Sequence, residues 1–183
     1  MARRSQPNRG KARRLSAVHF SSRTDDWTTP EWLFERLNAE FHFTLDPCST
    51  TENAKCQRHY TREEDGLAQD WSRDIVFMNP PYGREISRWM SKAVDSALSG
   101  ATVVCLVPAR TDTKWWHRFA MRGQIEFLPG RLKFGTAVNS APFPSAVVVF
   151  RSGFQCSDFS LNPDSIGQMR LDPHERISHA TQR

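Results

Sequence analysis

The sequence has no long apolar segment and no cysteine pattern typical of a secreted protein. None of its apolar runs approaches the roughly 18–20 residues that a membrane-spanning helix needs. The basic N-terminus is followed by no apolar stretch, so we predict neither a membrane span nor a secretory signal. No two cysteines have C-x-x-C spacing, which indicates reduced thiols in a cytosolic protein; the cysteines are Cys48, Cys56, Cys105 and Cys156.

A complete set of metal ligands is also missing. Cys56 and His59, with Cys48 nearby, are the nearest approach to a metal site. Structural zinc sites use four ligands, and the sequence offers no convincing fourth one. We therefore predict no bound metal.

Acidic residues are absent from the first 20 positions, which hold six basic residues. The whole chain has a formal net charge of +5, but residues 21–183 carry 19 basic against 20 acidic side chains. We predict that residues 1–23 form a disordered basic tail that holds phosphates without sequence preference, with Arg13 and Arg14 among the contacts. A solubilising tail without a partner is the alternative.

The apolar residues indicate one domain at positions 24–154. Over residues 155–183 the apolar density falls and no period persists, which predicts a loosely ordered C-terminal tail. Strand and helix patterns alternate within the domain, so we predict an α/β fold with a mostly parallel sheet. The predicted helices are 30–41 (capped by Thr28 or Thr29), 85–98 and 112–121, and the predicted strands are 43–46, 75–78, 101–109, 124–128, 131–135 and 145–150.

The stretch IVFMNPPYGR, residues 75–84, ends an apolar strand abruptly at Asn79. Proline cannot donate to a sheet ladder, so Pro80 and Pro81 stop the strand, and each also restricts the residue before it. Strand termination alone requires neither an asparagine before the prolines nor Tyr82 after them. Ligands of open α/β sheets bind at the carboxyl ends of strands, so we predict a site at this NPPY segment (residues 79–82).

The NPPY segment offers acceptors for an amine. The Asn79 side-chain oxygen and the Pro80 carbonyl lie close together, and the exocyclic amine of a nucleobase has two N–H donors. Acceptors that hold both hydrogens would draw the nitrogen towards tetrahedral geometry and free its lone pair for attack. We expect Tyr82 to stack on the base, which must be flipped out of a duplex to reach this segment. The arrangement fits methyl transfer from a sulfonium donor.

An ordered set of segments resembles one protein family. The segments are DWTTP (26–30), FTLDPCST (43–50), ENAKC (52–56), DGLAQDW (65–71), FMNPPYGR (77–84), GRLKF (130–134) and PFPSAVVVF (142–150). Over about residues 24–151 the chain resembles the phage-type DNA N6-adenine methyltransferases, the small Dam-like enzymes of bacteriophages and prophages. The resemblance implies a Rossmann-like fold, S-adenosylmethionine as cofactor, adenine N6 in DNA as acceptor and a bacterial cytoplasm as location. It also implies that residues 79–82 are the catalytic tetrapeptide, with Asn79 bordering the cofactor.

The resemblance implies further cofactor contacts. Asp46, followed by Pro47, matches the acidic strand-end position of the cofactor site. Thr29 and Pro30 match the segment that closes over the methionine end, and Asp65 matches a position near the adenine or ribose. Each has a structural alternative: Asp46 as a turn residue, Asp65 with its glycine as an ordinary turn, and Thr29 as a helix cap.

Two features depart from the usual nucleotide-binding pattern. A glycine-rich turn normally follows the first strand, but DPCST (46–50) contains no glycine. Only 27 residues, 47–73, separate Asp46 from Asp74, and they are polar and irregular with room for one short strand. Two strand–helix crossovers do not fit in that length, so we expect a fold that is reduced between the first strand and the NPPY strand.

No segment resembles a separate target-recognition domain, so DNA contacts are expected from loops, tails or a second subunit. The chain could act as a monomer or a homodimer. Arg110, Lys114 and Arg131 are predicted phosphate contacts. The neighbouring pair Trp115 and Trp116 fits either a nucleic-acid surface or the core. Alternative functions are methyl transfer to another amine (cytosine N4, RNA or protein glutamine) and a catalytically inert nucleic-acid-binding module.

Removal of residues 1–20 is expected to weaken DNA binding across unrelated sequences and to flatten its salt dependence. The reason is that six cationic side chains would no longer displace counterions from phosphates. Fluorescence anisotropy titrations at several salt concentrations measure both effects. An unchanged slope of log affinity against log salt would refute the role given to the tail.

Overall fold

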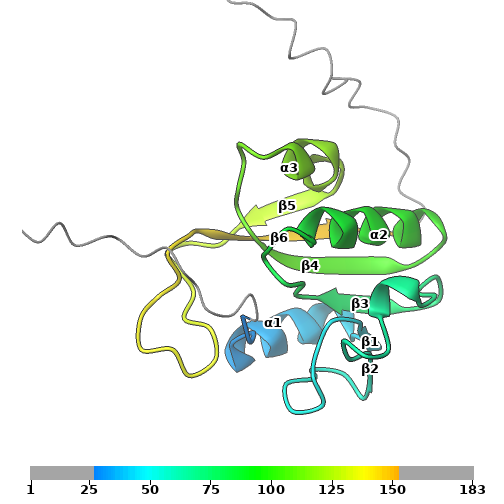
Figure 1. The fold of residues 1–183 in the computed structure, drawn as a ribbon, viewed down its shortest axis with the longest axis horizontal. Coiled ribbons are helices and arrows are strands. Elements are labelled where there is room, and N and C mark those ends of the chain that lie inside the picture. The colour runs from blue at the N-terminus through cyan, green and yellow to red at the C-terminus, as the bar shows by residue number, and fades with distance from the viewer. Residues whose placement is uncertain (1–26, 153–183) are drawn as a thin grey trace, which may run out of the picture.

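The computed structural model describes residues 27–152, so the predicted tails at 1–23 and 155–183 lie outside the described residues. It contains one six-stranded sheet with the order β2-β1-β3-β4-β6-β5 (Figure 1). No helix within this part of the chain is long and apolar enough to cross a membrane. The strands are β1 (Leu45–Asp46), β2 (Arg58–His59), β3 (Ile75–Met78), β4 (Thr102–Pro108), β5 (Gln124–Phe127) and β6 (Ser145–Phe150), and the helices are α1 (Glu31–Phe41), α2 (Ile86–Leu98) and α3 (Lys114–Arg118), with 3-10 helices η1 (Gly66–Ala68) and η2 (Ala120–Arg122).

The sheet is mixed. β1 pairs in parallel with β2 and β3, and β3 pairs in parallel with β4. β6 runs against both of its neighbours, β4 and β5. The α/β class is therefore confirmed, while uniform parallel pairing is limited to the half of the sheet from β2 to β4. As a result β1, β3, β4 and β5 all end at one edge of the sheet, and β6 begins there.

The centre of the sheet is buried on both faces. Every residue of β6 is buried, as is β4 from its second residue onward. Runs of apolar residues without alternation are typical of strands covered on both sides. α1 places Phe34 edge-on against Phe77 of β3, with ring centroids 5.2 Å apart, and α2 packs against β4 and β6.

The segment between the first strand and the NPPY strand is reduced, as predicted. Residues 47–74 form only the two-residue strand β2 and the three-residue helix η1. The chain nevertheless reaches the outer side of β1, because β2 adds to that edge in parallel register. The sheet therefore gains its edge strand without a helical crossover of ordinary length.

α1 begins differently from the prediction. Pro30 precedes its first residue, and no side chain caps the helix N-terminus. The predicted cap by Thr28 or Thr29 is therefore wrong, because the Thr29 hydroxyl accepts a hydrogen bond from Asn79 instead. Glu31 forms an ion pair with Lys55 rather than a capping box, which ties the loop after β1 to the start of α1.

Two further predictions need correction in the second half of the chain: the helix at 112–121 and the strand at 131–135. The helix predicted at 112–121 is shorter, since α3 ends at Arg118 and η2 follows it. Trp115 and Trp116 are both buried, so the pair belongs to the core rather than to a nucleic-acid surface.

The predicted strand at 131–135 is absent, and these residues lie in the loop between β5 and β6. The segment pairs elsewhere: the Gly135 N–H donates to the Thr28 carbonyl at 2.8 Å, and the Leu132 carbonyl accepts from Ala141 at 2.7 Å. Its alternating apolar residues point inward, with Leu132 and Phe134 buried. The alternation therefore reports a half-buried loop and not a sheet strand.

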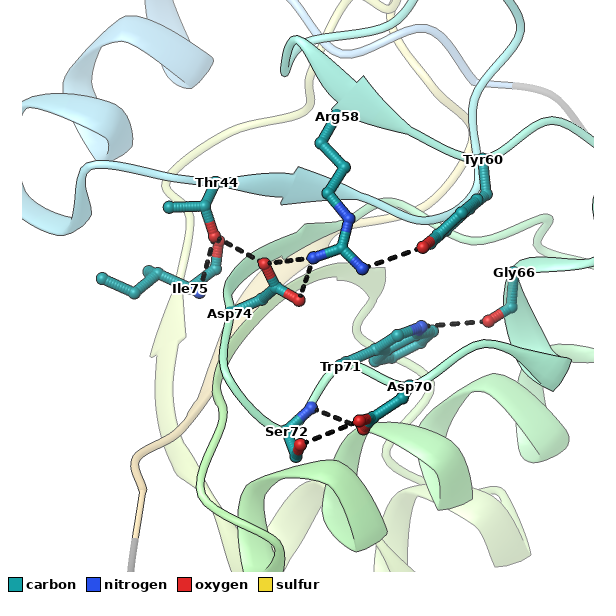
Figure 2. A network of polar contacts seen from close by, with 9 residues as sticks. All are labelled: Thr44, Arg58, Tyr60, Gly66, Asp70, Trp71, Ser72, Asp74 and Ile75. Carbon is teal, nitrogen blue, oxygen red and sulfur yellow. Dashed lines mark hydrogen bonds and ion pairs between the residues drawn. The ribbon is translucent and has the colours of Figure 1, made fainter.

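A polar network holds the short edge strand β2 in place (Figure 2). Arg58 Nη1 donates to both carboxylate oxygens of Asp74, at 2.8 and 2.7 Å. The Thr44 hydroxyl donates to Asp74 Oδ1 at 3.0 Å, and Arg58 Nη2 donates to the Tyr60 hydroxyl at 2.8 Å. One buried carboxylate thus links β2 with the residue before β1 and with the start of β3.

Replacement of Arg58 by alanine is expected to destabilise the fold by about 2–3 kcal/mol, because it leaves a buried carboxylate without its cation. The Asp74 side chain is 8% exposed and the Arg58 side chain 48% exposed. Asp74→Ala should therefore cost less, since water can hydrate the guanidinium that remains. Urea unfolding measures both. Arg88→Ala, which removes an exposed ion pair with Glu85, is the control and should change stability by about 0.5 kcal/mol or less. A larger loss in Asp74→Ala than in Arg58→Ala would contradict this account.

Candidate active site

A cavity of about 1020 Å³ lies at the edge of the sheet where β1 and β3 end. Its walls come from the segment before α1, the loop after β1, the turn at residue 65, the NPPY segment and the first turn of α2. Most of the cofactor residues implied by the sequence line this cavity: Thr29, Asp46, Pro47, Asp65 and Asn79. Pro30 is not part of the lining, and it stands at the start of α1.

The side-chain amide of Asn79 is held at both ends. Its Nδ2 donates to the Trp27 carbonyl and to Thr29 Oγ1, the latter at 2.9 Å. Its Oδ1 accepts from the Tyr82 hydroxyl at 2.7 Å. An amide oxygen has two acceptor positions, so Oδ1 keeps one for a further donor.

Tyr82 is buried, with 3% of its surface exposed. Its hydroxyl lies within 3.3 Å of the Leu106 carbonyl as well as near Asn79. Burial raises the pKa of Tyr82 well above its usual range, with a smaller contribution from Cys48, so the phenol stays protonated and remains a hydrogen-bond donor.

Three aromatic rings surround Tyr82. The Trp27 ring lies nearly parallel to it, with centroids 6.3 Å apart and planes 20° apart. Phe134 and Phe143 meet it edge-on at 6.0 and 5.6 Å. The place beside Tyr82 where we expected a base to stack is therefore occupied by this chain's own side chains in the described conformation.

The prolines of the NPPY segment leave one backbone acceptor open. Pro80 is buried and Pro81 half-buried, and Pro81 lines the cavity. The Pro80 carbonyl accepts no hydrogen bond from residues 27–152. Because Pro80 directly follows Asn79, this open carbonyl and the remaining acceptor position of Oδ1 belong to adjacent residues.

Asp46 organises the loop that follows β1. Its Oδ2 accepts from the Lys55 N–H at 3.0 Å, and its Oδ1 accepts from the Cys48 N–H at 3.4 Å. Burial raises the pKa of Asp46, while these two backbone hydrogen bonds oppose the rise. The carboxylate thus both lines the cavity and fixes the loop, so its two proposed roles are compatible.

The Asp65 turn is packed against the same strand end. Asp65 has a positive φ of 48° and caps η1, its carboxylate accepting from the Leu67 N–H at 3.2 Å. A Cβ on Gly66 would lie 1.9 Å from the Pro47 carbonyl oxygen, so only glycine fits. The Trp71 indole N–H donates to the Gly66 carbonyl at 3.0 Å (Figure 2). Gly66 and Trp71 therefore bring Asp65 to the cavity wall.

The predicted phosphate contacts lie at the surface. Arg110, Lys114 and Arg131 are exposed, and none of them forms an ion pair within residues 27–152. Arg110 follows the end of β4 and Arg131 follows the end of β5, so both lie at the edge of the sheet that carries the NPPY segment. Arg13 and Arg14 lie outside the described residues.

Trp27, Phe134 and Phe143 were not identified as site residues from the sequence. Each lies in a segment that resembles the family, but the tyrosine they enclose is distant along the chain. The sequence feature that could have identified Phe134 and Phe143 is that GRLKF and PFPS flank one loop and place an aromatic residue on each side of it. The GRLKF segment was predicted to be a strand, and its contact with Tyr82 through Phe134 was therefore not predicted.

No group of three or more His, Cys, Asp or Glu side chains in the described part of the chain is arranged to hold a metal ion. Burial raises the pKa of Cys56 to about 12, with a smaller contribution from Asp46.

The fold and the site define an α/β protein with a polar ligand cavity at the carboxyl edge of its parallel strands. The sequence model of the family described as DNA N-6-adenine-methyltransferase (Dam) matches residues 17–163, and the chain belongs to this family.

Similar proteins agree with this assignment. The DNA N-6-adenine-methyltransferase of Haemophilus phage HP1 is 34% identical over 94 residues, which are 50% of this chain and 54% of that protein. The protein of the same description from Escherichia phage T1 is 29% identical over 94 residues, 50% of this chain and 39% of that protein. The Escherichia coli K12 protein YfdM is 42% identical over 65 residues, 32% of this chain and 71% of that protein. The chain thus spans about half the length of the HP1 relative.

Gly66→Ala is expected to destabilise the protein by about 2–3 kcal/mol, because the added methyl collides with the Pro47 carbonyl and displaces the Asp65 turn. Gly130→Ala is the control: Gly130, unlike Gly66, has a positive φ of 73°, but an added Cβ there meets nothing within 4 Å. It should cost about 1 kcal/mol from backbone strain alone. Urea unfolding compares the two, and equal losses would contradict the collision.

Proposed function

We propose that this chain transfers a methyl group from S-adenosylmethionine to N6 of adenine in DNA, at a base held outside the duplex by the NPPY segment. The observation that supports this most is the pair of open acceptors on adjacent residues, Asn79 Oδ1 and the Pro80 carbonyl. Family membership supports adenine N6 as the acceptor among the possible amines. The parallel half of the sheet, β2 to β4, supports a reduced Rossmann-like methyltransferase fold.

The cavity fits the methyl donor. Its volume of about 1020 Å³ is ample for a ligand of that size, and its lining combines carboxylates with aromatic walls. Asp46 and Asp65 would face the cationic and hydroxyl-bearing parts of the donor, while Trp27 and Trp89 would contribute apolar surface. When bound, S-adenosylmethionine supplies an electrophilic methyl group.

The chain's own residues act on the target amine. The acceptor position left on Asn79 Oδ1 and the Pro80 carbonyl would each take one N6 hydrogen, which localises the nitrogen lone pair towards the methyl donor. Neither acceptor is a base, so both orient the amine rather than remove its proton. That proton leaves to water after transfer, because a methylated aromatic aminium ion is strongly acidic.

The target base must enter where Tyr82 is now enclosed. Trp27 and Phe143 are the half-buried rings around Tyr82, so one of them has to yield before a base can stack there. Arg110, Lys114 and Arg131, together with the basic residues 1–23, would hold the flanking phosphates. Residues 24–154 would then be the catalytic domain, acting in the cytoplasm of a bacterial host.

The direct test incubates the protein with methyl-labelled S-adenosylmethionine and unmethylated DNA, followed by digestion to nucleosides and mass identification. N6-methyladenine is the expected product. N4-methylcytosine, or label found only in RNA or protein, would refute the proposed acceptor. Cofactor binding without any transfer would refute the proposed activity.

Asn79→Ala is expected to lower the turnover of methyl transfer by about 10²–10³-fold, because it removes an acceptor that acts on the target amine. Donor affinity, measured by isothermal titration calorimetry, should change by about threefold or less. Gln124→Ala removes an exposed amide on β5 and serves as the control, with turnover unchanged. Near-normal turnover of Asn79→Ala would contradict the role of the amide.

A further inference from the structure

We propose that Thr29 is a positioning residue: its hydroxyl holds the Asn79 amide in the orientation that the Trp27 carbonyl selects, with Oδ1 towards the target. The inference rests on the proposed function, because it assigns to Asn79 Oδ1 the task of accepting the target amine. It concerns a contact across 50 positions of sequence, between the segment before α1 and the end of β3.

A side-chain amide can turn end for end at little steric cost, since its oxygen and nitrogen are nearly the same size. The two orientations are chemically opposite at this site. With Oδ1 towards the target, Asn79 accepts from the amine; with Nδ2 towards it, Asn79 would present a donor to a donor. The residues around Asn79 must therefore fix the orientation of its side-chain amide before the substrate binds.

The Trp27 carbonyl determines the orientation, and the Thr29 and Tyr82 hydroxyls stabilise it. The Trp27 carbonyl can only accept, so the amide end that faces it must be Nδ2. Thr29 Oγ1 lies 2.9 Å from the same nitrogen and takes its second hydrogen. On the other end, the Tyr82 hydroxyl donates to Oδ1 at 2.7 Å and leaves one acceptor position.

Thr29 is suited to this task and is not needed for another local one. Thr29 is 5% exposed, so its hydroxyl is largely shielded from bulk water. It does not cap α1, which begins after Pro30 without a side-chain hydrogen bond. The Asn79 amide forms no hydrogen bond with the side chain of Thr28, the adjacent threonine, whose carbonyl accepts from the Gly135 N–H.

The positioning has a further consequence for the order of events. Trp27 and Thr29 also form part of the cavity wall, so the segment that orients the catalytic amide is one that the methyl donor would touch. A donor that holds this segment closed would at the same time hold Oδ1 towards the target. Asn79 can therefore accept from the target amine only while the Trp27 carbonyl and the Thr29 hydroxyl bind its Nδ2.

The test combines a spectroscopic and a kinetic measurement on the full chain. The side-chain amide resonances of Asn79 are identified in a nitrogen–proton correlation spectrum by their loss in Asn79→Ala. In Thr29→Val we expect one of these two proton resonances to move upfield and to exchange faster with water. Thr29→Ser, which keeps the hydroxyl, should restore the wild-type positions, and Thr28→Val should leave them in place.

In steady-state methylation of duplex DNA, Thr29→Val is expected to lower kcat by about tenfold while both KM values change by about threefold or less. Thr29→Ser should recover most of kcat. Unmoved Asn79 resonances in Thr29→Val, or an unchanged kcat, would overturn the proposal. A loss in kcat accompanied by lowered melting temperature and shifts throughout the spectrum, without rescue by serine, would also overturn it in favour of a structural role.

The two proposals fail separately. If the wild-type chain methylates no DNA while the Asn79 resonances respond as expected, the proposed function is refuted and the orientation of the amide by Thr29 is supported. If the wild-type chain methylates adenine and the resonances do not respond, the function stands and the positioning is refuted.

Discussion

Three hydrogen bonds hold the Asn79 amide, and they join parts of the chain that are far apart in sequence. The Trp27 carbonyl and the Thr29 hydroxyl come from the segment before α1, and the Tyr82 hydroxyl comes from beyond the two prolines. The segment before α1 is in turn bonded to the loop between β5 and β6 through Thr28 and Gly135. One amide thus joins the beginning, the middle and the end of the described chain around the end of β3, and three aromatic rings surround Tyr82 on one side of these bonds.

The cavity beside this amide is built without the glycine-rich turn that usually follows the first strand of a nucleotide-binding fold. Hydrogen bonds to a side chain fix the loop after β1 instead, because the Asp46 carboxylate accepts from the backbone amides of Cys48 and Lys55. Gly66, which belongs to a different segment, is the glycine that lets the Asp65 turn approach Pro47 closely. Side-chain acceptors therefore do here what backbone flexibility does in the longer fold, and this is how so short a connection can still enclose a ligand-sized space.

Much of this arrangement could be predicted from the sequence, and the exceptions have a common cause. The strands β3, β4 and β6 and the helix α2 have strong local patterns, and the NPPY segment indicated the sheet edge where the cavity lies, because strand termination left Asn79 and Tyr82 unexplained. The errors at Thr28, Thr29 and residues 131–135 arose where a local signal was satisfied by a distant partner. A threonine before a proline is typical of a helix cap, but here the Thr29 hydroxyl accepts a hydrogen bond from Asn79. The alternation in RLKF is typical of a strand, but here Phe134 is buried in the aromatic cluster around Tyr82. The direction of β6 could likewise not be predicted locally, because a run of apolar residues does not indicate whether a strand pairs in parallel or antiparallel.

The reversed direction of β6 has a consequence for how such proteins can diversify. Because β5 ends and β6 begins at the same edge, the chain between them forms its return loop at that edge (Figure 1). The Phe143 ring of this loop contacts Tyr82. The loop is attached by the rings of Phe134 and Phe143 at its two ends, and its tip contributes nothing to the sheet. Val138, 85% exposed, lies in this free portion. Exchange of residues 136–140 between relatives, all of which are exposed, would therefore alter the surface presented to a substrate while leaving the strand register, the cavity and the oriented amide as they are.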